Sequence, residues 1–125
     1  KTSDLSSITE LSQRRFLRMI DFFYGNWDAM KLIVCCSKGS SYERIFDKAI
    51  DITENDTFRL LKLDGVKMSR RIKFFIHVMV TSHFENLKEI FYHNLKKTEA
   101  VEYVLDFNIY HCAGWKQYWM EQVKG

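Results

Sequence analysis

The sequence predicts an all-α fold. Its 125 residues contain no proline, whereas about six would be usual at this length, so helices can run without interruption. Long segments also repeat hydrophobic residues at the three- and four-residue spacing of a helix. We therefore expect about five helices in an antiparallel bundle. A chain of this length with 46% hydrophobic residues can bury one core, which predicts a single domain over residues 1–125.

Two helices are predicted in the first part of the chain. A capping box of Ser7 and Glu10 indicates the start of the first helix, which we expect to end near Gly25. The second covers residues 27–36, is hydrophobic on nearly all sides and is expected to be short and buried; residues 37–39 stop it. The hydrophobic stripe of the first helix is Ile8, Phe16, Met19, Ile20, Phe23 and Trp27.

A third, long amphipathic helix follows a second capping box, formed by Ser40 and Glu43. Gly65 is its expected stop, because glycine readily adopts the left-handed conformation that ends many helices. Its polar side is expected to face water. One hydrophobic stripe runs through it: Tyr42, Ile45, Phe46, Ala49, Ile50, Thr53, Leu60 and Leu61.

The last two helices are predicted over residues 69–94, with Ser69 as the cap, and 97–124. Both carry hydrophobic residues on more than one face, and a second face requires a second neighbour. We therefore expect these helices to form a four-helix bundle with a second copy of the chain. Gly114, inside the last helix, costs about 0.5–1 kcal/mol relative to alanine, which favours close approach of another backbone over a tolerated surface glycine.

Four groups of residues, in this order, give the chain a family likeness. They are the short apolar helix running into Cys35-Cys36-Ser37 and then Gly39-Ser40-Ser41-Tyr42-Glu43, the pair Glu89 and His93, the run Glu99-Ala100-Val101-Glu102-Tyr103-Val104, and Ala113-Gly114-Trp115-Lys116. With them, nearly the whole chain resembles the C-terminal domain of TetR-type transcriptional regulators. It departs from the family where a proline often opens the last bundle helix, because Lys97 stands there.

The resemblance implies an effector-binding and dimerisation domain. A small, partly apolar ligand would bind among the middle helices and modulate DNA binding by an N-terminal helix-turn-helix domain that this chain lacks. The dimer would be a four-helix bundle made from the last two helices of each copy. The chain opens at Lys1 without an initiator methionine, so we expect it to begin inside a longer gene product.

Two sets of residues follow from this interpretation. For the ligand, His77 and Tyr42 would be the polar groups of an otherwise apolar cavity, although aromatic residues at helical spacing are more often ordinary core. The candidate ligand-binding residues are Phe22, Phe23, Trp27, Met30, Tyr42, Phe46, Phe58, Phe74, His77 and Tyr110. The candidate dimer-interface residues are Thr81, Phe84, Lys88, Phe91, Phe107, His111, Gly114, Trp115 and Tyr118.

Two alternatives stay open. The chain could be a helical interaction module with a filled core and no ligand, or a thiol sensor acting through Cys35 and Cys36. Adjacent cysteines in an apolar helix are more often buried, so burial is the expectation for this pair. No histidine pair has the four-residue spacing of a helical metal site, and no nucleophile and base face each other, so neither a metal, a cofactor nor catalysis is expected.

Charge and cysteine content limit the location and partners of the chain. The net charge of +3 is modest, so we expect operator DNA to be bound only through the missing domain. The cluster of Arg14, Arg15 and Arg18 is more often solvated surface or a contact to another domain. Three cysteines without a spaced framework, no signal sequence and no long apolar run predict a cytoplasmic protein that neither crosses a membrane nor is exported.

Overall fold

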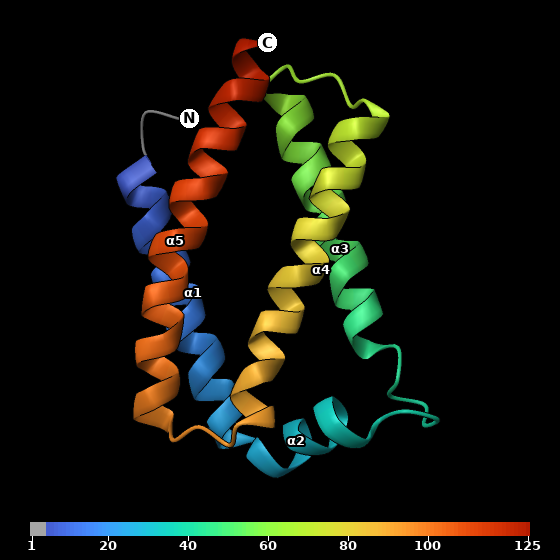
Figure 1. Cartoon of the computed structure of the whole chain (residues 1–125), viewed down its shortest axis with the longest axis vertical. Helices are drawn as coiled ribbons and strands as arrows, with labels where there is room; N and C mark the ends of the chain where they lie inside the picture. The colour runs from blue at the N-terminus through green and yellow to red at the C-terminus, as the bar shows by residue number, and fades with distance from the viewer. Residues whose placement is uncertain (1–4) are drawn as a thin grey trace. The chain divides into compact units, whose positions relative to one another are not determined.

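The computed structural model describes residues 5–125, with side chains from Ile8 onward, and over that range it contains helices and no strand. The all-α prediction is confirmed, including the expected number of helices. Five of them follow in order (Figure 1): α1 (Leu5–Gly25), α2 (Trp27–Cys36), α3 (Ile45–Leu63), α4 (Arg70–Tyr92) and α5 (Lys97–Lys124).

The chain divides into two compact units, each built on one pair of long helices. In the first unit, residues 5–30 and 94–125, α1 packs against α5. In the second, residues 31–93, α3 packs against α4. The helix α2 contributes its first residues to one unit and its last residues to the other. The single domain expected over residues 1–125 stays a prediction.

The first unit is an antiparallel helix pair. One end of α1 is joined to the middle of α5, where Asn108 contacts Ser12, and the other end is joined to the start of α5, where Lys97 pairs with Asp21. The hydrophobic residues that the two helices bury recur at helical spacing, as an amphipathic stripe requires. They are Phe16, Ile20 and Phe23 of α1 and Ala100 and Val104 of α5.

The second unit is also an antiparallel pair, because Phe46 near the start of α3 contacts Phe84 in the second half of α4, while Glu54 further along α3 pairs with His77 nearer the start of α4. Each buried hydrophobic side chain of this kind contributes about 1.5–3 kcal/mol to folding. The buried hydrophobic residues of α3, α4 and the segment between them are Leu61, Val66, Ile72, Ile76, Val80, Leu87, Ile90 and Phe91.

The turn between α3 and α4 follows the predicted signals. Gly65 has a φ of +84°, and its N–H donates to the carbonyl of Lys62, while the N–H of Val66 donates to the carbonyl of Leu61. This is the Schellman arrangement, which satisfies carbonyls that a helix end leaves open. Ser69 then caps α4 as predicted, with its hydroxyl accepting from the N–H of Ile72 at 3.2 Å.

The predicted start of α3 is wrong. The helix begins at Ile45 and its cap residue makes no side-chain cap bond. The hydroxyl of Ser40 instead donates to the carbonyl of Ser37 at 2.6 Å and accepts from the N–H of Tyr42, and the Glu43 carboxylate accepts from the N–H of Gly39. The capping residues therefore stabilise a turn before the helix, since the same side-chain bonds serve both structures.

Two further differences concern α1 and α2. Helix α1 already includes Ser7, so it begins earlier than the predicted cap. The expected burial of α2 is wrong: none of its residues is buried, and Leu32 is 61% exposed. No helix within residues 5–125 is both long and apolar enough to span a bilayer.

Candidate functional site

A row of contacting rings along α5 is the most distinctive group of side chains in the first unit. The rings of Tyr103 and Phe107 stack with centroids 6.1 Å apart, Phe107 and His111 stack at 5.2 Å, and His111 meets Trp115 edge-on at 6.2 Å. Residues four apart lie above one another on a helix, which brings these rings together. We call the following residues the aromatic ladder: Tyr103, Phe107, His111, Trp115, Tyr118 and Trp119.

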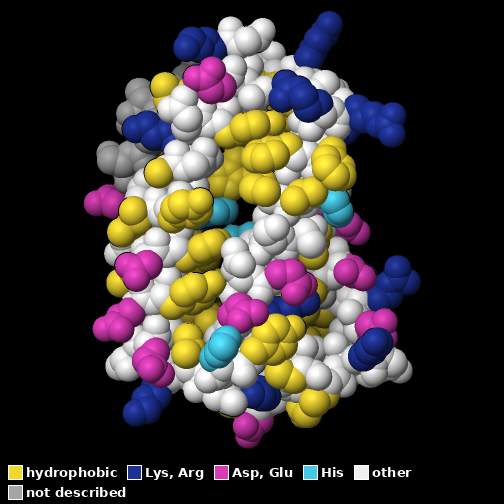
Figure 2. Space-filling view, in the orientation of Figure 1, with side chains coloured by type: hydrophobic (Ala, Val, Ile, Leu, Met, Phe, Trp, Pro, Cys, Tyr) yellow, Lys and Arg dark blue, Asp and Glu magenta, His cyan; other side chains and the backbone are white. Residues whose placement is uncertain are grey.

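The rings of the central row make further aromatic contacts. Trp115 meets the rings of Tyr118 and Trp119 at 6.0 and 6.4 Å, and Phe16 of α1 meets Phe107 edge-on at 5.8 Å. All six ladder residues are half-buried. Hydrophobic side chains can be followed along α5 in Figure 2. The ladder therefore offers aromatic faces and edges that are only partly withdrawn from solvent.

His111 is a titratable ring of the ladder with a shifted pKa. Burial lowers the pKa of His111 below its ordinary value, because the low-dielectric surroundings disfavour the charged imidazolium. Its neighbours Phe107 and Trp115 provide no opposite charge that would restore it. The imidazole is therefore neutral near pH 7 and can offer one hydrogen-bond donor and one acceptor.

Asn108 fixes the ladder helix against α1. Its side chain is 1% exposed; its Oδ1 accepts from the hydroxyl of Ser12 at 2.6 Å and its Nδ2 donates to the carbonyl of Thr9 at 3.2 Å. The thiol of Cys112 also donates to Oδ1 at 3.3 Å. A buried amide that is satisfied in this way specifies one axial position of the two helices, because a shift would leave its polar atoms unpaired.

The beginning of α5 is held by Tyr24 of α1. The Tyr24 hydroxyl donates to the carbonyl of Leu95 at 2.7 Å, and its ring stacks on Trp27 with centroids 4.8 Å apart. Burial and, to a smaller extent, the nearby Glu99 carboxylate raise the pKa of Tyr24, since both disfavour a phenolate. Tyr24 is thus protonated at neutral pH and can keep this hydrogen bond.

Another face of α5 is open to solvent. Ile109 is 67% exposed and Tyr110 is 82% exposed, and a Cβ added at Gly114 would meet nothing within 4 Å. The described part of this chain therefore does not supply the backbone that we expected close to Gly114. A second chain or a tolerated surface glycine remain the two interpretations of that residue.

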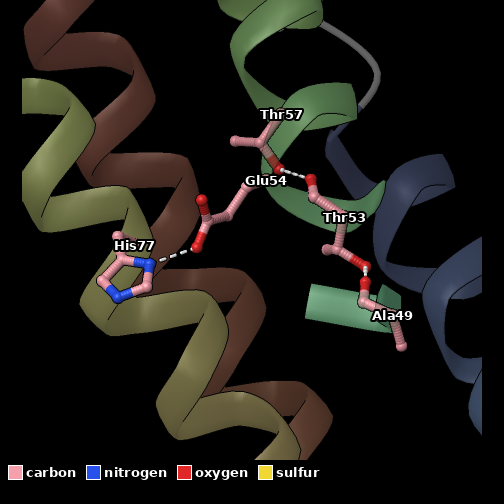
Figure 3. Close-up of polar contacts among 5 residues, drawn as sticks. All are labelled: Ala49, Thr53, Glu54, Thr57 and His77. Atoms are coloured by element: carbon pink, nitrogen blue, oxygen red, sulfur yellow. Dashed lines mark hydrogen bonds and ion pairs between the residues drawn. The ribbon is translucent and has the colours of Figure 1, made fainter. Parts of the chain in front are cut away.

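The second unit contains a polar group between α3 and α4. The carboxylate of Glu54 pairs with Nδ1 of His77, and the hydroxyls of Thr53 and Thr57 each donate to the carbonyl four residues earlier, at 2.8 Å (Figure 3). The threonine hydroxyls are thus used by the backbone of their own helix, whereas the Glu54–His77 pair joins the two helices.

Phe46 is the centre of a second group in this unit. Its ring lies 6.4 Å from Phe84, and the Lys88 ammonium lies 4.6 Å from its centroid, within the range of a cation–π interaction. Lys88 also pairs with Glu85 at 2.8 Å. These contacts join α3 to the second half of α4.

The predicted ligand-binding residues are distributed over both units. Phe22, Phe23, Trp27, Met30 and Tyr110 belong to the first unit, and the others to the second. Trp27 stacks on Tyr24, Phe46 contacts Phe84 and Lys88, and His77 pairs with Glu54. Phe23 is buried, Trp27, Met30, Phe46 and Phe58 are half-buried, and the exposed ones are Phe22, Tyr42, Phe74, His77 and Tyr110.

The predicted dimer residues of α4 take part in packing inside the second unit. Phe84 and Lys88 contact Phe46, and Phe91 is 1% exposed with its carbonyl accepting from the Lys31 ammonium at 2.8 Å. The Thr81 hydroxyl is buried and has no hydrogen-bond partner among the described residues. The predicted dimer residues of α5 fall in the ladder, apart from Gly114.

The thiols do not form a metal centre within the described range. Cys35 and Cys36 are exposed, so the expected burial of this pair is wrong, and Cys112 is half-buried beside Asn108. Over residues 5–125, no three side chains of the types His, Cys, Asp and Glu are grouped so that they could hold a metal ion. Exposure keeps Cys35 and Cys36 accessible to reagents.

Sequence reasoning did not single out Asn108 or Ser12. The available signal was a polar residue at a position of the α5 stripe between Val104 and Cys112, four residues from each. A polar side chain in such a stripe is either buried with a hydrogen-bond partner or exposed to solvent. The sequence alone does not identify that partner.

Comparison with known proteins identifies no relative of this chain. The sequence matches no family model, and no curated protein or solved structure shows a significant match. The observations on the chain itself establish an all-α arrangement of five helices over residues 5–125, without a family assignment.

Proposed function

We propose that this chain is the effector-binding and dimerisation domain of a transcriptional regulator of the TetR type, and that its effector binds at the aromatic ladder of α5. The observation that carries the proposal is the row of six half-buried rings on one helix. Ligand sites are lined mainly by apolar and aromatic side chains with a few polar groups, and the ladder has this composition.

The chemistry of the ladder suits an aromatic ligand that is neutral or positively charged. Tyr and Trp rings attract planar apolar groups and, over their faces, cations. The lowered pKa of His111 supports the same choice, because a neutral imidazole does not repel a cation and can still orient a ligand by one hydrogen bond. The ligand class is thus small, partly apolar and aromatic.

Regulation requires that the ligand favour one arrangement of the helices. A ligand that binds two arrangements equally well shifts nothing. The ladder is joined to α1 through the Phe16–Phe107 contact and the Asn108 hydrogen bonds, so a ligand that displaces a ladder ring changes the packing of α1 on α5. In a longer protein that displacement would be passed to a DNA-binding domain.

The test is a thermal-shift screen of the chain against aromatic compounds, neutral and cationic. A hit present at 100 times its dissociation constant stabilises the folded chain by about 2.7 kcal/mol. The stabilisation should be lost in His111→Leu and kept in Phe74→Leu, since Phe74 is 68% exposed on α4 and outside the ladder. A hit that depends on Phe74 and not on His111 would move the site to the second unit.

A thiol sensor is the second candidate, favoured by the exposure of Cys35 and Cys36. It predicts that alkylation of these two thiols changes the response, while aromatic compounds have no effect. An interaction module with a filled core predicts a dimer that no compound stabilises. The same screen, repeated on alkylated protein, separates the three functions.

A further inference from the structure

The outer face of α5 consists of residues that share one side of the helix and are all exposed. It lies away from the buried stripe that contains Val104 and Asn108. Successive members are separated by three or four residues, as a single helix face requires. They are Glu102, Asp106, Ile109, Ala113, Gln117, Met120 and Lys124.

The charges of the outer face are divided between its two halves. Glu102 and Asp106 lie in the first half, and Lys124 ends the second. Acidic side chains gather over the N-terminal half of α5 in Figure 2. In the described part of the chain, no ion pair involves Glu102, Asp106 or Lys124. An antiparallel copy of the same helix would place acid against base, whereas a parallel copy would place like charges together.

The spacing of the charges defines a register. Glu102 precedes Ala113 by 11 residues and Lys124 follows it by 11, while Ile109 and Gln117 each stand four residues away. With a rise of about 1.5 Å per residue, both charges lie about 16 Å from Ala113, on opposite sides. A two-fold axis at Ala113 therefore brings Glu102 of each copy opposite Lys124 of the other.

The centre of the outer face permits close approach. Ala113 lies at the axis, and its side chain is small and exposed. Small residues let two helix axes approach to about 8 Å. Ile109 and Met120, 67% and 43% exposed, flank the centre and supply hydrophobic area that such a contact would bury.

We infer that the outer face of α5 pairs with the same face of a second copy of this chain, antiparallel about Ala113, with Glu102 against the partner's Lys124. The occupant is a second copy because the face complements itself, as a closed two-fold contact requires. The inference rests on the homodimer of the proposed function and gives it an interface beside the ladder, so ladder and interface share one helix.

Charge reversal tests the register. Glu102→Lys and Lys124→Glu each replace attraction by repulsion at two symmetric positions, and each is expected to raise the dimer dissociation constant about tenfold. The double variant restores opposite charges and is expected to return to within about threefold of the original value. Sedimentation equilibrium measures all four proteins. Glu10→Lys is the matched control, because Glu10 is an exposed acid on α1 and is expected to change nothing.

The outcomes separate this inference from the proposed function. Two results would overturn the register: a dissociation constant that neither charge reversal changes, or a dimer that is weaker in the double variant than in the single variants. In either case the dimer would form through another face. A chain that stays monomeric at every concentration overturns the register and the dimer of the proposed function together, while effector binding at the ladder is still judged by the thermal-shift screen.

Discussion

Asn108 is the residue whose change should most weaken the pairing of α1 with α5. Asn108→Ala removes the acceptor of the Ser12 hydroxyl and a donor to the Thr9 carbonyl at a position that is 1% exposed. Because unpaired buried polar groups are costly, we expect a loss of about 2–3 kcal/mol in the free energy of unfolding. Urea denaturation followed by circular dichroism measures it.

The matched control for this change is Asn55→Ala. Asn55 is exposed on α3, so its loss should stay within about 0.5 kcal/mol. Equal losses in the two variants would show that the Asn108 hydrogen bonds add nothing to stability.

His111 gives the chain a pH dependence of known sign. Its pKa is lowered in the folded chain, so between that value and about 6.5 the unfolded chain binds more protons and stability falls as the pH falls. Relative to His111→Leu, the wild-type chain should therefore lose stability below about pH 6.5 and not above it. Thermal denaturation of both proteins from pH 5 to pH 8 checks this, and parallel curves would contradict it.

The sequence indicated some features of individual residues and did not indicate others. The ring spacing that forms the ladder is visible in the sequence, and the assignment of Phe107, His111 and Trp115 to a dimer interface stays a prediction. Exposure of Cys35 and Cys36 was not foreseen, because the expected burial relied on the apolar character of α2 and not on what lies against it. A hydrophobic segment predicts a need for burial, while tertiary contacts decide whether it is met.

At the scale of elements, helix ends were predictable where one residue type has one structural role. Gly65 in the left-handed conformation and Ser69 as a cap both appear as expected, because few residues can replace them there. The start of α3 was not, since Ser40 and Glu43 can close a turn as well as cap a helix. The boundaries of α2 and α5 agree with the prediction.

Two glycines should respond in opposite directions to the same substitution. Gly65→Ala forces a Cβ into a φ of +84° and should cost about 1–2 kcal/mol. Gly114→Ala meets open space inside a helix and should stabilise by about 0.5–1 kcal/mol. Chemical denaturation of the two variants at low protein concentration gives both values. A destabilising Gly114→Ala that also weakens self-association would instead place a partner's backbone at Gly114.

At the scale of the whole molecule, α5 is proposed to serve two purposes. One side carries the ladder, with its neutral His111, and the outer face carries the exposed hydrophobic residues and the divided charges. Sequence periodicity indicated that α5 has more hydrophobic surface than one neighbour can cover. It could not indicate which face of α5 a second copy would contact, because that depends on which residues of α5 already pack against other helices of the same chain.

Sedimentation equilibrium of the unmodified chain is the most direct test, because the proposed function includes a homodimer and the outer face of α5 is its proposed interface. We expect a species of twice the 15.0 kDa chain mass, with a dissociation constant that rises with salt as the Glu102–Lys124 contacts are screened. A mass that stays at 15.0 kDa up to millimolar concentration would contradict it.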